Sequence, residues 1–220
     1  MTQELTLYHY WRSSCSWRVR WALAIKKIPA NLVPINLLKS EHKSHVYLAK
    51  NPDETVPSME INGHTYGESL ALLEWVEQTY PNPSILPKDP LEKLKVRQLA
   101  YIIAMGTQPI QNLKVLKYIS DSRSEQIKFA NYWVQRGLKT YETLLDGKKG
   151  DYSVGNKITL ADLCLIPQCY NAKRFGVDLE QFINIKKINE NCMSLESYKK
   201  SSPENFESFY EVHPLNRTEL

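Results

Sequence analysis

Residues 5–36, LTLYHYWRSSCSWRVRWALAIKKIPANLVPIN, decide the fold of the first half of the chain. Between residues 5 and 10 the side chains alternate and include two tyrosines, which predicts a short strand. A helix is expected from about Cys15 to Lys26, and ANLVPIN, residues 30–36, is typical of a second strand. Because a helical crossover separates the two strands, they are expected to pair in parallel. The segment therefore predicts a β–α–β unit.

The next 44 residues extend this unit with a helix, a hairpin and a closing helix. A polar helical stretch is expected around residues 42–49. The segments VPSMEI and HTY flank Asn62–Gly63, a pair that favours a two-residue hairpin turn and thus an antiparallel strand pair. Residues 68–80, ESLALLEWVEQTY, carry apolar side chains at helical spacing. The predicted order is β–α–β–α–β–β–α.

A proline-rich segment, PNPSILPKDP at residues 81–90, marks the domain boundary, because proline continues neither helices nor strands. We expect an α/β domain over residues 1–82, a linker over 83–90 and an all-helical domain over 91–220. The last ~15 residues are expected to form a loosely ordered tail, as chain ends commonly do. Helices are predicted in the second half, with bends at Pro109 and Pro167, over residues 91–118, 124–145, 159–172 and 183–194.

One capping signal in the second half is strong. In ITLAD, residues 158–162, Thr159 can cap a helix that begins at Leu160 while Asp162 reaches back to it. The helix body, LADLCLIPQCYNA, is apolar almost all round and should cross the middle of its domain. We assign Thr159 and Asp162 a structural role.

Composition excludes several classes of protein. The 220 residues, 42% of them hydrophobic, suffice for an ordinary core, and the apolar runs are too short to span a bilayer. The net charge of +4 comes from separated lysine pairs and not from a basic stripe, so nucleic-acid and membrane partners are not expected. The four cysteines lack metal-ligand spacing. A cytoplasmic protein with no metal is predicted.

The segment RSSCSW, residues 12–17, lies where a strand turns into a helix. Such a junction presents free backbone N–H groups and the positive end of the helix dipole, which favour an anion. Ser13 or Ser14 alternatively only caps the helix. A Cys–His hydrolase built on Cys15 is a further alternative, but nothing in the sequence fixes a partner histidine. We assign no role to His9, His45, His64 or His213.

Several motifs together resemble the cytosolic glutathione transferases. Val56–Pro57 before the hairpin, Glu68–Ser69 at a helix start and ITLAD are landmarks of that family. Other segments are similar to its zeta class over nearly the whole chain: SSCSWRVRWAL, VPINLLK, PIQNLKVLKY, LADLCLIPQCYNAKRFGVDL and the final TEL. The resemblance implies a thioredoxin-like first domain, an all-α second domain, a homodimer and glutathione as cofactor.

The resemblance also implies where glutathione binds. Pro57 would be cis, the Val56 backbone would pair with the cysteinyl part, and Glu68 and Ser69 would hold the γ-glutamyl end. Glu68 and His42 depart from the class, which often has glutamine at both places. Ser13 is the first choice for activating the thiol, with Ser14 and Cys15 supporting or competing. The full set of implied glutathione contacts is Ser13, Ser14, Cys15, Ser16, Arg18, His42, Val56, Pro57, Glu68, Ser69, Gln108, Asn112, Leu113 and Lys114.

The implied activity is the cis–trans isomerisation of maleylacetoacetate in aromatic amino-acid breakdown. A thiolate would add to the cis double bond, the resulting single bond would rotate, and elimination would give the trans product. Arg174 matches the arginine that binds the substrate carboxylate, and Arg12 is a weaker candidate. Arg174 alternatively forms only a salt bridge. Maleylpyruvate isomerisation, conjugation of small electrophiles such as α-haloacids, and a non-catalytic glutathione-binding module remain as alternative functions.

Overall fold

The computed structural model describes residues 4–210, which divide into two compact units. The first unit contains the chain up to Pro83 and again from Glu196 onward. The second unit is Ser84–Leu195. The motif TEL and His213 lie outside the described residues.

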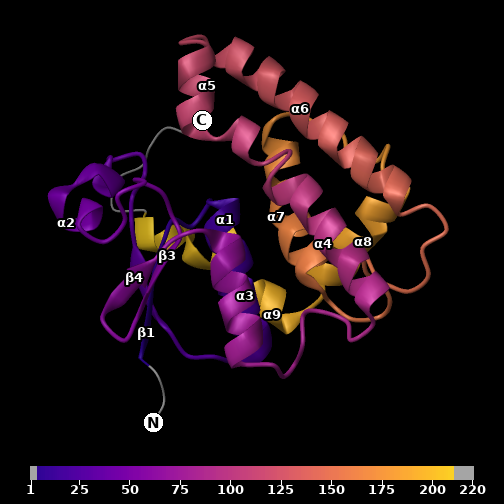
Figure 1. Cartoon of the computed structure of the whole chain (residues 1–220). Helices are drawn as coiled ribbons and strands as arrows, with labels where there is room; N and C mark the ends of the chain where they lie inside the picture. The colour runs from indigo at the N-terminus through magenta and orange to yellow at the C-terminus, as the bar shows by residue number, and fades with distance from the viewer. Residues whose placement is uncertain (1–3, 211–220) are drawn as a thin grey trace. The chain divides into compact units, whose positions relative to one another are not determined.

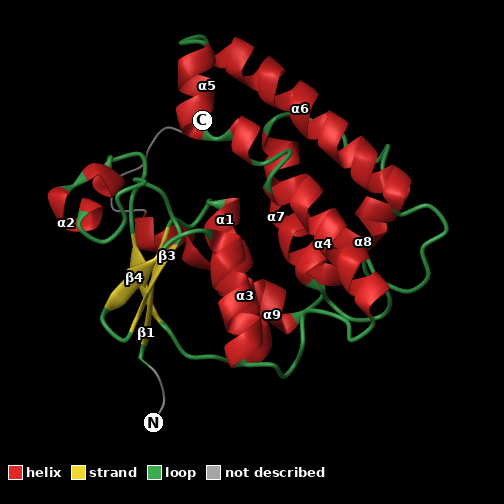
Figure 2. Cartoon of the chain, in the orientation of Figure 1, coloured by secondary structure: helices red, strands yellow, loops and turns green. Residues whose placement is uncertain are grey.

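The first unit is built on a four-stranded mixed sheet (Figure 2). The sheet order is β2-β1-β3-β4, with β1 and β2 parallel and the other two pairings antiparallel. In the β3–β4 hairpin, Asn62 and Gly63 have φ values of 52° and 80°, as the predicted primed turn requires. The parallel pair and the hairpin are therefore confirmed, with strands β1 Leu5–His9, β2 Asn31–Pro34, β3 Ser58–Ile61 and β4 His64–Tyr66.

The helices of the first unit follow the predicted order. The long helices α1 and α3 pack against each other (Figure 1). The stretch predicted around residues 42–49 forms two short pieces, a 3-10 helix η1 and the helix α2. Their bounds are α1 Ser14–Lys26, η1 Glu41–Lys43, α2 His45–Leu48 and α3 Ser69–Thr79.

The end of the described chain differs from the expectation that residues 91–220 form one helical domain. The helix α9, Glu196–Ser201, and the 3-10 helix η3, Pro203–Tyr210, belong to the first unit. The physical reason is the surface of α1, which carries two large indoles. The indole N–H of Trp17 donates to Ser201 Oγ at 3.2 Å, and that of Trp21 donates to Ser197 Oγ at 3.1 Å. The Tyr198 ring packs edge-on against both indoles.

All regular secondary structure of the second unit, residues 84–195, is helical. Its central helix α7 packs against α4, α6 and α8 (Figure 1). Almost every side chain of α7 is buried, as predicted, and Pro167 lies inside the helix. The bounds are α4 Pro90–Ala104, η2 Pro109–Gln111, α5 Leu113–Ile119, α6 Arg123–Leu144, α7 Leu160–Arg174 and α8 Ile183–Met193.

The capping box at the start of α7 is confirmed. The Thr159 backbone N–H donates to Asp162 Oδ2 at 2.8 Å, and the N–H of Ser153 donates to Oδ1 at 2.9 Å. Asp162 is fully buried, and burial raises the pKa of its carboxyl group above the ordinary value. The aspartate thus holds the loop before α7 as well as the helix end.

The prediction of one bent helix over residues 91–118 is wrong. The chain leaves α4 after Ala104 and forms η2 and then α5. Thr107 Oγ1 donates to the Ile102 carbonyl at 2.8 Å, which closes the end of α4. Gly137 of α6 packs directly on this turn, since a Cβ there would lie 2.1 Å from Thr107 Oγ1. Pro109 alone did not reveal this full break.

Candidate functional site

The N-terminus of α1 is capped by Ser13. Its Oγ accepts a hydrogen bond from the Ser16 backbone N–H at 3.2 Å, so the capping role is confirmed. A serine hydroxyl that accepts such a bond still has its own proton to donate. Capping by Ser13 and donation to an anion over the first turn are therefore compatible.

The other small residues of this turn have different environments. Ser14 is buried, and Cys15 is a half-buried reduced cysteine. Ser16 is fully buried, and its Oγ accepts from the Tyr10 backbone N–H at 3.3 Å. This bond fixes the end of β1 to the start of α1, which favours a positioning role for the Ser16 side chain.

Arg18 is the most informative side chain of α1. It is 1% exposed, and its Nη1 donates to Ser69 Oγ at 3.3 Å. Its Nε and Nη2 are buried and have no hydrogen-bond partner among the described residues. A buried guanidinium is costly unless acceptors, preferably anionic ones, satisfy its donors. The environment of Arg18 therefore fits an anionic ligand held between α1 and α3.

The start of α3 has an unusual backbone. Glu68 precedes the helix with φ 59° and ψ 102°, and its side chain is exposed. A non-glycine residue in such a conformation costs about 1–3 kcal/mol and is typical of ligand clamps. Ser69, the first residue of α3, is buried beside Arg18. The structure thus brings Arg18 and Ser69, both expected to contact the ligand, within hydrogen-bond distance of each other.

The remaining residues predicted in the first unit lie between β1 and α1, after β2, and before β3. Val56–Pro57 is cis, as expected. Val56 belongs to a buried cluster with Tyr10, Ile35 and Tyr47. His42 is half-buried in η1, and the Arg12 guanidinium lies 4.6 Å from the centre of the Trp11 ring.

In the second unit, four predicted residues surround the break between α4 and α5. Gln108 and Asn112 flank η2, while Leu113 and Lys114 begin α5. A side-chain amide pair that sequence reasoning missed holds η2 in place. Gln111 Nε2 donates to Gln168 Oε1 at 2.9 Å, and Gln168 Nε2 donates back at 3.1 Å. Both side chains are buried.

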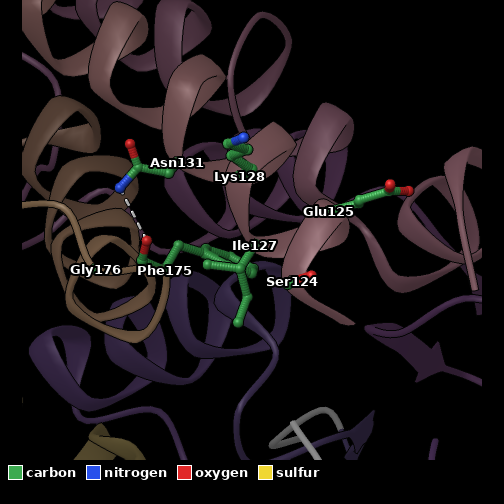
Figure 3. Close-up of a pocket in the computed structure, with 7 residues that line it drawn as sticks. All are labelled: Ser124, Glu125, Ile127, Lys128, Asn131, Phe175 and Gly176. Atoms are coloured by element: carbon green, nitrogen blue, oxygen red, sulfur yellow. Dashed lines mark hydrogen bonds between the residues drawn. The ribbon is translucent and has the colours of Figure 1, made fainter. Parts of the chain in front are cut away.

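Arg174 is the last residue of α7. It is half-buried, and its Nη1 donates to Asn171 Oδ1 at 3.0 Å, which fixes one edge of the guanidinium. The next two residues, Phe175 and Gly176, form one wall of a pocket of about 590 Å³ in the second unit (Figure 3). The opposite wall comes from α6, where Asn131 Nδ2 donates to the Phe175 carbonyl at 2.9 Å. The pocket is lined by Ser124, Glu125, Ile127, Lys128, Asn131, Phe175 and Gly176.

Both halves of the chain match one protein family. Residues 7–84 match the glutathione S-transferase N-terminal domain, and residues 110–201 match the corresponding C-terminal domain. The chain belongs to the glutathione S-transferase family. The two-domain fold expected from the sequence is therefore confirmed.

Individual relatives place the chain in the zeta class of the family. Maleylacetoacetate isomerase of Rattus norvegicus is 44% identical over 199 residues, covering 90% of this chain and 91% of the relative. A solved maleyl pyruvate isomerase, described as a bacterial zeta-class glutathione S-transferase, has a TM-score of 0.88 at 35% identity, covering 90% of this chain and 96% of its own. A third relative is the solved maleylacetoacetate isomerase of Anaeromyxobacter dehalogenans 2CP-1, which has dicarboxyethyl glutathione and citrate bound in its active site. Its TM-score is 0.84 at 37% identity, and the match covers 92% of this chain and 96% of that chain.

Two further buried residues of this transferase, His9 and Arg20, were missed as partners. The Arg20 Nη1 lies 3.2 Å from His9 Nδ1. Burial, and secondarily the charge of Arg20, lowers the pKa of His9 to about 3. The alternation in residues 5–10 placed His9 on the same face as Leu5 and Leu7, which was a signal that it is buried.

The transferase shows no metal centre within residues 4–210, where no cluster of His, Cys, Asp and Glu could hold an ion. Cys164, Cys169 and Cys192 are buried and reduced, as expected of small core residues. Burial raises the pKa of Cys169 to about 12, so its thiol stays protonated. No helix of the described chain has the length and apolar character to cross a membrane.

Proposed function

We propose that this chain is a glutathione-dependent isomerase that converts maleylacetoacetate to fumarylacetoacetate in the breakdown of tyrosine and phenylalanine. The observation that carries the proposal is Arg18 beside Ser69, with two buried donors that have no partner among residues 4–210, in a chain that belongs to the glutathione S-transferases. Relatives named maleylacetoacetate isomerase, 44% identical over 90% of the chain in the rat protein, support the choice of substrate.

The residues of the first unit fit glutathione as the ligand. Arg18 and Ser69 can donate to the γ-glutamyl carboxylate, and the exposed Glu68 carboxylate can receive its ammonium group. Val56–Pro57 is cis, as the resemblance implies, which supports the Val56 backbone as the partner of the cysteinyl part. His42 would approach the glycyl carboxylate. The chemistry that glutathione supplies when bound is a thiolate, which adds to the cis double bond and leaves after rotation.

Ser13 and the first turn of α1 would favour the ionised form of the thiol. The hydroxyl proton of Ser13 and the helix dipole both stabilise negative charge there. Each unit by which the thiol pKa falls corresponds to about 1.4 kcal/mol. Cys15, half-buried in the same turn, would support or compete with Ser13.

Arg174 would bind a carboxylate of the diacid substrate. Asn171 fixes one edge of its guanidinium at 3.0 Å, which orders the side chain before the substrate arrives. A planar fork can donate two parallel hydrogen bonds to a carboxylate. Arg12 would be a second cation beside the thiol.

Maleylpyruvate isomerisation is the second candidate function, because a maleyl pyruvate isomerase shares the fold at a TM-score of 0.88. The loss of maleylacetoacetate and of maleylpyruvate, measured with and without glutathione, separates the two. Glutathione binding without turnover of either substrate, or of α-haloacids, would instead indicate a binding module. Turnover of α-haloacids alone would refute the isomerase activity and leave a transferase.

The role of Arg174 has its own test. Replacement of Arg174 by alanine should raise KM for the diacid by about tenfold or more, the loss of a charged hydrogen-bond pair, with little change in KM for glutathione. The matched control is Lys173→Ala, which removes an exposed cation from the adjacent position of α7. Equal changes in both KM values would remove Arg174 from the substrate site.

We also propose a cytoplasmic homodimer. The exposed side chains Leu91, Leu94 and Met105 lie on one face of α4 and its last turn, where a second copy can cover them. The described cysteines are reduced, which suits a reducing compartment. Sedimentation of the parent protein and of the Leu94→Glu variant tests the dimer, since a charge on this face should yield monomers. Cell fractionation tests the location.

A further inference from the structure

Arg20 joins the end of the described chain to the start of the site. We call residues 196–210, which form α9 and η3, the C-terminal strap. Arg20 is 3% exposed, and its Nε donates to the Ser201 carbonyl of the strap at 3.2 Å. Its guanidinium also lies 4.7 Å from the centre of the Phe206 ring. One edge of the side chain is thus held by the strap.

The other edge of Arg20 holds the segment that leads into the first turn of α1. Nη1 donates to the Tyr10 carbonyl at 3.2 Å, and Nη2 donates to the Trp11 carbonyl at 2.9 Å. The Tyr10 carbonyl also accepts the Ser13 backbone N–H at 3.1 Å. Arg20 and Ser13 therefore share one acceptor, and a shift of that carbonyl moves Ser13.

His9 completes the environment of this guanidinium. Arginine has no acceptor, so the contact at 3.2 Å requires that His9 Nδ1 accepts and that the ring proton is on Nε2. The His9 ring also packs edge-on against Phe206. These contacts lock the guanidinium plane, and a lysine at this place could not reach the three carbonyls at once.

We propose that Arg20 is a positioning residue for thiol activation, which sets the place of Ser13 through the Tyr10 and Trp11 carbonyls and is itself held by the C-terminal strap. This inference rests on the proposed function, because it takes Ser13 as the hydroxyl that activates glutathione. Arg20 acts at a distance, through the backbone, and contacts neither glutathione nor the substrate.

The test measures the thiol pKa of bound glutathione from its thiolate ultraviolet absorbance, together with kcat and KM, in full-length variants. Arg20→Lys keeps the positive charge but loses the planar guanidinium that reaches several carbonyls at once. The thiol pKa should therefore rise by about one unit, and kcat at neutral pH should fall about tenfold. KM for glutathione should change less than about twofold, since the γ-glutamyl contacts stay. Ser197→Ala is the matched control, because it removes the strap's bond to Trp21 without touching Arg20. It should lower Tm and leave the thiol pKa unchanged.

The outcomes separate this inference from the proposed function. If Ser13→Ala leaves the thiol pKa unchanged, Ser13 does not activate the thiol and this inference is refuted, while the isomerase proposal keeps its own test, the loss of maleylacetoacetate with and without glutathione. If Ser13→Ala raises the thiol pKa while Arg20→Lys only lowers Tm, Arg20 is merely structural and this inference alone is refuted. If Arg20→Lys does not fold, Phe206→Leu decides, since loss of the ring under the guanidinium should raise the thiol pKa in the same direction by a smaller amount. An unchanged thiol pKa in Phe206→Leu would overturn the positioning role.

Discussion

Acidification should destabilise this protein through His9. Folding lowers the pKa of His9 from 6.5 to about 3. Between these two values the unfolded chain is protonated at His9 and the folded chain is not. The contribution of His9 to the free energy of unfolding is fully present above pH 6.5 and is lost as the pH falls from 6.5 toward 3. The slope approaches about 1.4 kcal/mol per pH unit, so the loss between pH 7.5 and pH 5 is about 2 kcal/mol.

The measurement is the free energy of unfolding in urea across this pH range, followed by tryptophan fluorescence at a fixed protein concentration. His9→Gln is the comparison, because its amide can still accept from Arg20 but does not titrate. Subtraction of the two curves removes groups that both proteins share, including Asp162, whose pKa is raised by burial. The stability gap should change by about 2 kcal/mol in favour of His9→Gln at the lower pH. Parallel curves for the two proteins would show that His9 is not shielded from water.

Three other substitutions test the packing and the site. Arg18→Met should weaken glutathione binding at least about tenfold and yet raise Tm without ligand, since it removes a buried charge with two donors that lack partners in the described part of the chain. Calorimetry of both quantities checks this, and a lower Tm would contradict it. Gly137→Ala should lower the free energy of unfolding by about 1–3 kcal/mol, because the new Cβ would lie 2.1 Å from Thr107 Oγ1. The control is Lys139→Ala at an exposed position of the same helix, which should leave the free energy of unfolding unchanged. Gln168→Leu should cost about 1–3 kcal/mol by leaving Gln111 unsatisfied, and the double variant with Gln111→Leu should recover part of it in urea titrations; additive losses would argue against the amide pair.

Local chemistry made much of the fold predictable from the sequence. Asn62–Gly63 permits only a few turn types, and Thr159 with Asp162 specifies a helix start, so both were placed correctly. The break after Ala104 was missed because the turn that follows it involves a tertiary contact, in which Gly137, far along the chain, packs on Thr107. No local pattern predicts contacts of this kind.

Individual residues of the candidate site could be predicted from the sequence, but the contacts between them could not. A strand-to-helix junction with small hydroxyl residues pointed to an anion at Ser13, and the structure confirms that Ser13 caps α1. The resemblance indicated Arg18, but only burial shows that two of its donors lack partners within the described chain. Arg20 and His9 were overlooked, because the Ser201 carbonyl that meets Arg20 lies 181 positions away in the sequence.

The docking of α9 on α1 has a consequence for synthesis on the ribosome. Trp17 and Trp21 emerge early, but Ser197, Tyr198 and Ser201, which contact them, are translated far later, with sequence separations of 184 positions for Trp17–Ser201 and 176 for Trp21–Ser197. The thioredoxin-like unit therefore cannot finish its interior while the chain is growing, although N-terminal domains commonly fold first. Nascent chains halted before residue 196 would expose two indoles and should be favoured clients of chaperones.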